Sequence, residues 1–196
     1  MLEKLHREKL HHDIMRAAAL GTARTLERSA RALGWQPISL EPATLEAAAS
    51  RIVGLDDFGD PYYREGLGRL VHSLEHDADL HIFGRACMRQ LMRTALVNRL
   101  LLQQQKRTRP EIFDAPLRPP IIITGLPRTG STFLHRLMSR IPGFFAPPYW
   151  LLVRPLPTCS DEPEEVRRST ARREMGWWKS ITPSIRAKHA LNTEAP

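Results

Sequence analysis

The 196-residue sequence has little cysteine, few aromatic residues and no long apolar run. Its two cysteines, Cys87 and Cys159, belong to no CxxC or Cys/His pattern, so neither a disulfide framework nor a zinc site is expected. This cysteine usage fits a reducing cytoplasm. No apolar run approaches the roughly 18 residues of a membrane span, and the charged N-terminus MLEKLHREKLHHD lacks the apolar stretch of a secretory signal. We therefore expect a soluble protein.

Basic residues exceed acidic ones, 29 against 21, which gives a formal charge of +8 and a pI near 10.2. This balance suits an anionic ligand, nucleic acid or an anionic membrane surface, and the sign alone does not choose among them. His6, His11 and His12 cluster near the N-terminus, but no carboxylate or cysteine stands at a spacing that would complete a metal shell. A metal site is not expected there.

The first 105 residues show helical periodicity and no convincing strand. One or two helices are predicted over 2–33, and another from Pro42 to a stop at Gly54. A third is predicted after the Asp60–Pro61 pair, which suits a helix N-terminus. A fourth is predicted over 82–105. Its expected inward residues are Met88, Leu91, Met92, Ala95, Leu96 and Leu100.

The stretch KRTRPEIFDAPLRPP, rich in proline and scattered charge, predicts a connector. The chain then divides into a helical region over 1–105, a connector over 106–119 and an α/β region over 120–196. The α/β region begins with a predicted strand, Ile121 to Thr124, and a helix over 131–140. Next, FFAPPYWLLVRPLP predicts an irregular segment that either packs in the core or lines a pocket.

The last predicted helix runs over about 163–178. Its arginines alternate with glutamates at helical spacing, which favours a solvated face with salt bridges over a nucleic-acid-binding stripe.

The loop between the predicted strand and the next helix, in TGLPRTGSTFLHRLM, carries the chemistry. A strand that enters a glycine-bearing turn and then a helix directs backbone N–H groups and the positive helix end at one point, where anions bind. Gly125 and Gly130 permit close approach of the backbone. Ser131 and Thr132 supply hydroxyl donors, and Arg128 adds a charged fork suited to tetrahedral oxyanions. The loop therefore predicts a phosphate-binding site.

The nucleotide-hydrolysing P-loop has the pattern G-x-x-x-x-G-K-[ST]. From Gly125 to Thr132 the spacing is the same, but Ser131 occupies the lysine position. The usual cation on the β/γ-phosphates is therefore missing, which disfavours ATP or GTP hydrolysis. A kinase or NTPase-like protein stays an alternative.

The same stretch closely resembles the 5′-phosphosulfate-binding loop of sulfotransferases that use 3′-phosphoadenosine-5′-phosphosulfate (PAPS). LDDFGDP and the proline-rich approach to the strand also resemble bacterial sulfotransferase-like proteins with a helical N-terminal region, so that the resemblance covers roughly residues 45–196. It implies an α/β fold of the P-loop type with a central parallel sheet. It also implies transfer of a sulfuryl group from PAPS to a hydroxyl acceptor, which is a small molecule, lipid or sugar, without a metal.

The resemblance implies roles for individual residues. Arg128 would stabilise the bridging oxygen as the sulfuryl group departs. His189 is the first candidate for the general base, and His135 and Glu194 are weaker ones. The residues implied in binding PAPS are Gly125, Pro127, Arg128, Thr129, Gly130, Ser131 and Thr132.

Only 66 residues follow Gly130, which is little chain for the crossovers of a parallel sheet. The resemblance also implies a second binding site, in which an arginine and a serine after a later strand bind the 3′-phosphate of PAPS. This sequence has no counterpart of that site. The sequence is therefore expected to be the N-terminal portion of a sulfotransferase-like protein, mainly helical with one or two parallel strands. A non-catalytic remnant is a further alternative.

Overall fold

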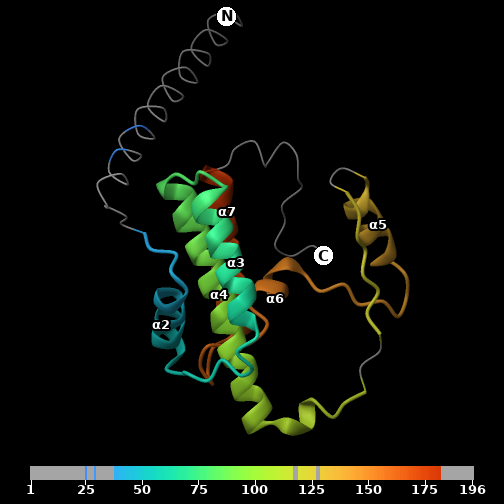
Figure 1. Ribbon diagram of the computed structural model, residues 1–196. Coiled ribbons are helices and arrows are strands. Elements are labelled where there is room, and N and C mark those ends of the chain that lie inside the picture. Colours follow the sequence, from blue (N-terminus) through green and yellow to red (C-terminus); the bar gives the residue numbers. More distant parts are fainter. Residues whose placement is uncertain (1–24, 26–28, 30–37, 117–118, 127–128, 182–196) are drawn as a thin grey trace, which may run out of the picture.

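The computed structural model describes residues 25, 29, 38–116, 119–126 and 129–181, and these are predominantly helical (Figure 1). The helices predicted over 2–33 lie outside the described residues, apart from Thr25 and Ser29. The elements in chain order are α2 (Pro42–Val53), α3 (Tyr63–His76), α4 (Ile82–Thr108), the short 3-10 helix η1 (Pro110–Ile112), α5 (Ser131–Met138), α6 (Tyr149–Val153) and α7 (Glu164–Ile181).

Helix α2 begins and ends where its sequence predicts. Pro42 takes the first helical position, where its missing N–H costs nothing. Gly54 ends the helix in the left-handed conformation at φ 68°, and its N–H donates to the carbonyl of Ser50 at 2.8 Å. Leu45 and Ala49 are fully buried on the face that packs against α4.

Helix α3 begins two residues later than the Asp60–Pro61 pair predicts, at Tyr63. The carboxylate of Asp60 accepts a hydrogen bond from the Tyr62 N–H at 2.8 Å, so it closes a turn before the helix and does not cap the helix itself.

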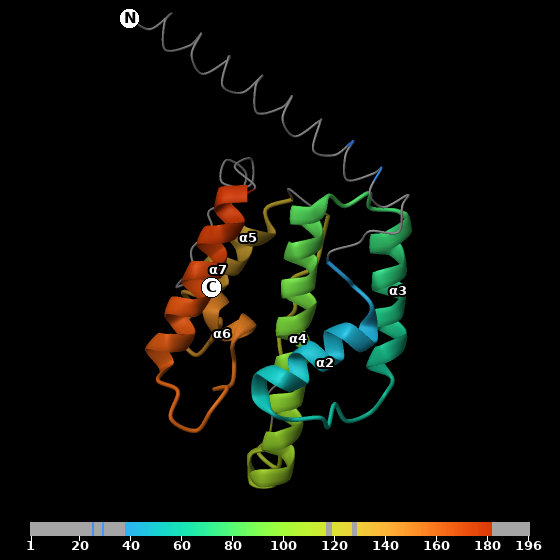
Figure 2. The same cartoon turned by 90° about the vertical axis from the view of Figure 1, so that its left-hand side faces the viewer.

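The main apolar core forms where α2 crosses the long helix α4, with α3 beside them (Figure 2). Leu91 and Ala95, two of the predicted inward residues, are exposed, Leu91 by 48%. Val97 and Leu101 are buried in their place. The core residues are Leu40, Leu45, Ala49, Phe58, Met92, Leu96, Val97, Leu100 and Leu101.

Helices α6 and α7 pack against each other on the side of α4 that lies away from α3 (Figure 2). Polar side chains tie this pair to α4: Asn98 donates to the carbonyl of Val153 at 2.9 Å, and Gln90 donates to Glu174 at 2.8 Å. The predicted salt-bridged face of α7 is present, since Arg168 pairs with Glu164 at 2.6 Å. Glu174, by contrast, faces α4.

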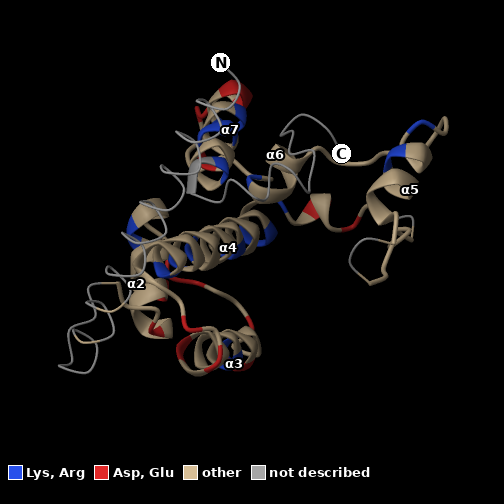
Figure 3. Ribbon diagram, turned by 90° about the horizontal axis from the view of Figure 1, so that it is seen from above, with Lys and Arg blue, Asp and Glu red and all other residues tan. Residues whose placement is uncertain are grey.

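The segment 121–124 is not a strand, contrary to the sequence prediction, and the described residues contain no β-strand. A strand is held by ladder hydrogen bonds to a neighbour, and no described segment forms such bonds with this one. Two of its three isoleucines are accordingly exposed, Ile121 by 62% and Ile122 by 79%. Figures 1 and 3 show this segment and α5 standing apart from the other helices. The α/β part of the predicted fold is therefore not formed by the described residues.

Candidate functional site

The described part of the predicted anion-binding loop is a tight turn. The hydroxyl of Thr129 donates to the carbonyl of Leu126 at 2.7 Å. A methyl group added at Gly125 would come within 3.2 Å of that hydroxyl oxygen, so the hydroxyl occupies the space a side chain would need. Pro127 and Arg128, at the tip of the loop, lie outside the described residues.

Helix α5 starts directly from this turn. Gly130 precedes it in the left-handed conformation, φ 91° and ψ 10°, which favours glycine over any residue with a Cβ. The Gly130 carbonyl accepts the first helical bond, from the Leu134 N–H at 3.0 Å, and no side chain caps the helix. The N–H groups of Ser131 and Thr132 therefore have no acceptor within the helix. They lie at its positive end, where an anion is stabilised.

The surroundings of this turn are open. Ser131 and Thr132 are exposed, and so are the apolar residues before and after them. We call residues 119–126 and 129–145 the apolar arm. Its exposed large apolar residues are Ile121, Ile122, Leu126, Phe133, Leu134, Leu137, Ile141, Phe144 and Phe145. An uncovered set of this kind is typical of a surface that packs against further polypeptide.

The candidate bases are only partly described. His135 lies in α5, one turn beyond the start of the helix, and is half-buried. His189 and Glu194 lie outside the described residues. The structure thus places Gly125, Thr129, Gly130, Ser131 and Thr132 around one turn and does not place the predicted cation or the first candidate base.

The aromatic segment 144–150, which leads into α6, is divided between core and surface. Phe145 is exposed, whereas Trp150 is only 4% exposed. The guanidinium carbon of Arg168 lies 4.7 Å from the centroid of the Trp150 ring, which is the distance of a cation–π contact. Burial raises the pKa of the Tyr149 hydroxyl, and the negative charge of Glu174 raises it further. The Trp150 ring is therefore buried, whereas Phe145 lies at the surface.

The LDDFGDP stretch forms an ordered loop between α2 and α3. Arg99 of α4 donates from Nε to the Phe58 carbonyl at 2.6 Å and from Nη2 to the Asp60 carbonyl at 2.7 Å. Its guanidinium carbon also lies 4.3 Å from the centroid of the Tyr63 ring. No sequence signal marks Arg99 for this role, because its partners are backbone carbonyls about 40 positions away.

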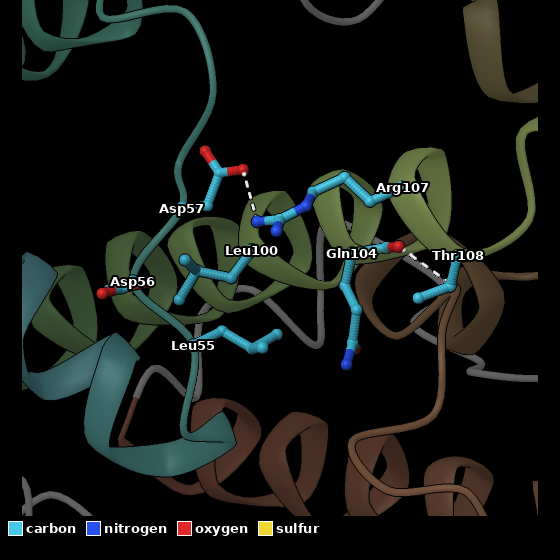
Figure 4. A pocket seen from close by; sticks show the side chains of 7 residues that line it. All are labelled: Leu55, Asp56, Asp57, Leu100, Gln104, Arg107 and Thr108. Carbon is cyan, nitrogen blue, oxygen red and sulfur yellow. Dashed lines mark hydrogen bonds and ion pairs between the residues drawn. The ribbon is translucent and has the colours of Figure 1, made fainter.

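A groove of about 230 Å³ lies between this loop and the C-terminal part of α4 (Figure 4). Leu55 and Leu100 supply its apolar lining, and Asp57 pairs with Arg107 across it at 3.3 Å. Figure 3 shows acidic residues along the connection from α2 to α3 and basic residues at intervals along α4. None of the residues that line this groove belongs to the 125–132 loop.

Among the described residues, no three His, Cys, Asp or Glu side chains are grouped so that they could hold a metal ion. No helix in the same part of the chain is both long and apolar enough to cross a membrane.

Comparison with known proteins finds two similarities. The model of the sulfotransferase family matches residues 119–195, which include the whole loop. The fold is similar to the crystal structure of a sulfotransferase from Mycobacterium tuberculosis H37Rv, with a TM-score of 0.59 and 31% sequence identity. None of the curated proteins gives a significant match.

Residues 119–195 thus match the sulfotransferase family, and the chain is similar in sequence and fold to a sulfotransferase. The mycobacterial match covers 82% of this chain but 45% of the other protein. The chain therefore spans less than half the length of the sulfotransferase it matches.

Proposed function

We propose that the 125–132 loop binds the 5′-phosphosulfate group of PAPS and that the chain contributes to sulfuryl transfer onto a hydroxyl acceptor. PAP and a sulfate ester would be the products. The observation that carries the proposal is the left-handed Gly130 followed by the uncapped first turn of α5, within the segment that matches the sulfotransferase family. Such a turn offers N–H donors and positive potential to a tetrahedral oxyanion.

The residues of the loop fit such a group. Gly130 has open space where a side chain would stand and keeps the backbone accessible, and the hydroxyl-bearing Ser131 and Thr132 are exposed. Thr129 holds the turn closed through its bond to Leu126 and is assigned a shaping role. When bound, PAPS supplies an activated sulfuryl group.

We assign Arg128 to the leaving group. Its positive charge stabilises the negative charge that develops on the oxygen between the 5′-phosphate and the departing sulfuryl group. We assign His189 as the base that removes the proton from the acceptor hydroxyl, with Glu194 as the second choice. His135 is a less suitable base, because it is half-buried in α5.

We further propose that residues 120–196 are the N-terminal part of a P-loop α/β domain that more polypeptide completes. The exposed Ile121 and Ile122 support this, because they would be buried once strands pair on both sides of residues 121–124. The coverage of 45% of the mycobacterial sulfotransferase supports it as well. On this view the 3′-phosphate site and the full activity depend on the additional polypeptide.

Calorimetric titration of the chain with PAP, and separately with ATP with and without Mg²⁺, tests the proposal. We expect PAP to bind more tightly than ATP, and Arg128→Ala to weaken PAP binding at least about tenfold, since a charge-assisted contact contributes about 1.5–3 kcal/mol. Arg136→Ala is the matched control, because Arg136 is an exposed arginine of α5 beyond the first turn.

Two results would contradict the proposal. Equal PAP affinity in the Arg128→Ala and Arg136→Ala variants would show that the loop does not bind PAP. Tighter binding of ATP with Mg²⁺ than of PAP would favour a kinase or NTPase-like protein instead. In the completed protein, Arg128→Ala is expected to slow transfer by about two decades, the usual loss for one preorganised donor.

A further inference from the structure

The junction of α6 and α7 contains three buried N–H donors without an acceptor: Trp150 Nε1, Arg154 Nε and Arg167 Nε. Among the described residues, no other buried side-chain nitrogen or oxygen lacks a hydrogen-bond partner. All three are donors, so the missing group is an acceptor. Leaving a buried donor unsatisfied costs about 1–3 kcal/mol, so three in one place strongly favour an acceptor from outside the described residues.

The three donors belong to one neighbourhood. Arg154 follows Trp150 by one turn, and its backbone N–H donates to the Trp150 carbonyl at 2.9 Å. Arg167 of α7 donates from Nη1 to the carbonyls of Arg154 and Pro155, at 3.2 and 2.9 Å. Its guanidinium carbon lies 5.5 Å from the centroid of the Trp150 ring. The donors thus come from both helices at the point where α6 and α7 pack together.

The charges at the junction favour an anion over water. Arg154 pairs with Glu174 at 2.5 Å, and the same carboxylate oxygen accepts a bond from Gln90. Arg167 is half-buried, and its contacts are to backbone carbonyls and the Trp150 ring, with no carboxylate among its partners. Water would satisfy the N–H groups but would leave this guanidinium charge without a counterion.

We propose that the α6–α7 junction binds a tetrahedral oxyanion, sulfate or phosphate or the terminal group of such an ester, through Trp150, Arg154 and Arg167. Two guanidinium groups and an indole N–H are strong donors for such a group, and the buried setting strengthens each bond. This site is separate from the 125–132 loop and does not depend on the function proposed for that loop.

Indole ¹⁵N NMR of the full chain tests the proposal, because Trp150 contributes one of only four indole N–H resonances. Trp150→Phe assigns that resonance. The chain is titrated with sodium sulfate, with sodium phosphate and with 4-nitrophenyl sulfate, each against sodium chloride at equal ionic strength. We expect a saturable shift of the Trp150 resonance with the oxyanions and none with chloride. Comparison of the three ligands shows whether the site takes the free ion or an ester.

Arg167→Lys keeps the positive charge but removes the Nε–H, and it is expected to weaken the response at least about tenfold, as for loss of one charge-assisted contact. Arg173→Lys, at an exposed position of the same helix, should leave it unchanged. Arg128→Ala should also leave it unchanged, which separates this site from the loop. A Trp150 resonance that does not respond in the wild-type chain, or a response that survives in Arg167→Lys, would overturn the proposal.

Discussion

The guanidinium of Arg85 donates two parallel hydrogen bonds to the carboxylate of Glu75, Nη1 to Oε2 and Nη2 to Oε1, each of 2.6 Å. Arg85 is only 3% exposed, and its Nε also donates to the carbonyl of Ile38 at 3.1 Å. One side chain near the start of α4 therefore holds the end of α3 and the segment that leads into α2. The helical core depends on this contact as well as on apolar packing.

Arg85→Met is expected to lower the free energy of unfolding by about 3 kcal/mol, because it removes a buried guanidinium from its carboxylate and from a backbone carbonyl. Arg69→Met is the control. Arg69 forms an exposed pair with Glu65 at 2.6 Å, and its loss should cost no more than about 0.5 kcal/mol. Urea denaturation measures both values. Equal losses of unfolding free energy in the two variants would show that the buried contact stabilises the fold no more than the exposed ion pair does.

Local signals in the sequence predicted the helical part of the fold well. Pro42 and Gly54 predicted both ends of α2, because proline and left-handed glycine restrict the backbone whatever surrounds them. The inward face of α4 was predicted less well. Leu91 was expected inside and is half-exposed, while Val97 is buried. Periodicity gives the width of an apolar stripe, but its position around the helix depends on where neighbouring helices lie.

Only those features of the candidate site that depend on neighbouring residues in the sequence could be predicted. The glycines and hydroxyls of the turn follow from the loop pattern, and Gly130 has the left-handed conformation that favours glycine. The strand over 121–124 did not appear, because a strand needs a neighbour that the described residues do not provide. The unmatched donors around Trp150 were not predictable, because they arise from the packing of α6 on α7.

Gly59→Ala is expected to destabilise the protein by about 1–2 kcal/mol, because Gly59 has a φ of 69°, where a Cβ meets the backbone. The added methyl would also lie 2.5 Å from the side chain of Gln103, which must move aside. Gly66→Ala is the matched control. Gly66 lies in α3 with open space around it, and alanine there should stabilise the helix by about 0.5–1 kcal/mol. Thermal unfolding should therefore show a lower midpoint temperature for Gly59→Ala and a higher one for Gly66→Ala. A lower midpoint in both variants would contradict this prediction.

The carboxylate of Glu46 accepts hydrogen bonds from Tyr63 at 2.7 Å and from Arg64 at 3.0 and 3.1 Å. Burial alone would raise the pKa of Glu46, but these bonds and the charge of Arg64 outweigh it and hold the pKa below its ordinary value of 4.5. Glu46 therefore stabilises the fold above its unfolded-state pKa, and this contribution is lost as the pH falls through the folded-state value.

Glu46→Gln is expected to lower the free energy of unfolding by about 1 kcal/mol near neutral pH. The difference from wild type should shrink as the pH falls below 4.5. Urea unfolding across this range measures it, and Glu65→Gln, at an exposed ion pair, serves as the control. A difference that stays constant down to about pH 3, below the ordinary range of glutamate, would contradict the assignment.

The apolar arm and the helical core should respond differently to the same loss of side chain. Leu100 is fully buried between α2 and α4, and Leu100→Ala is expected to cost about 3 kcal/mol of unfolding free energy. Ile122 is exposed, so Ile122→Ala should change this value by no more than about 0.5 kcal/mol.

Urea unfolding of the 196-residue chain compares the two variants directly. A small effect at Ile122 means that its apolar side chain does not stabilise the fold of this chain. It would then be available to pack against the polypeptide that we propose completes the α/β domain. A cost at Ile122 similar to that at Leu100 would instead mean that the arm is already packed in this chain. The proposal that further polypeptide supplies the strands that pair with residues 121–124 would then be wrong.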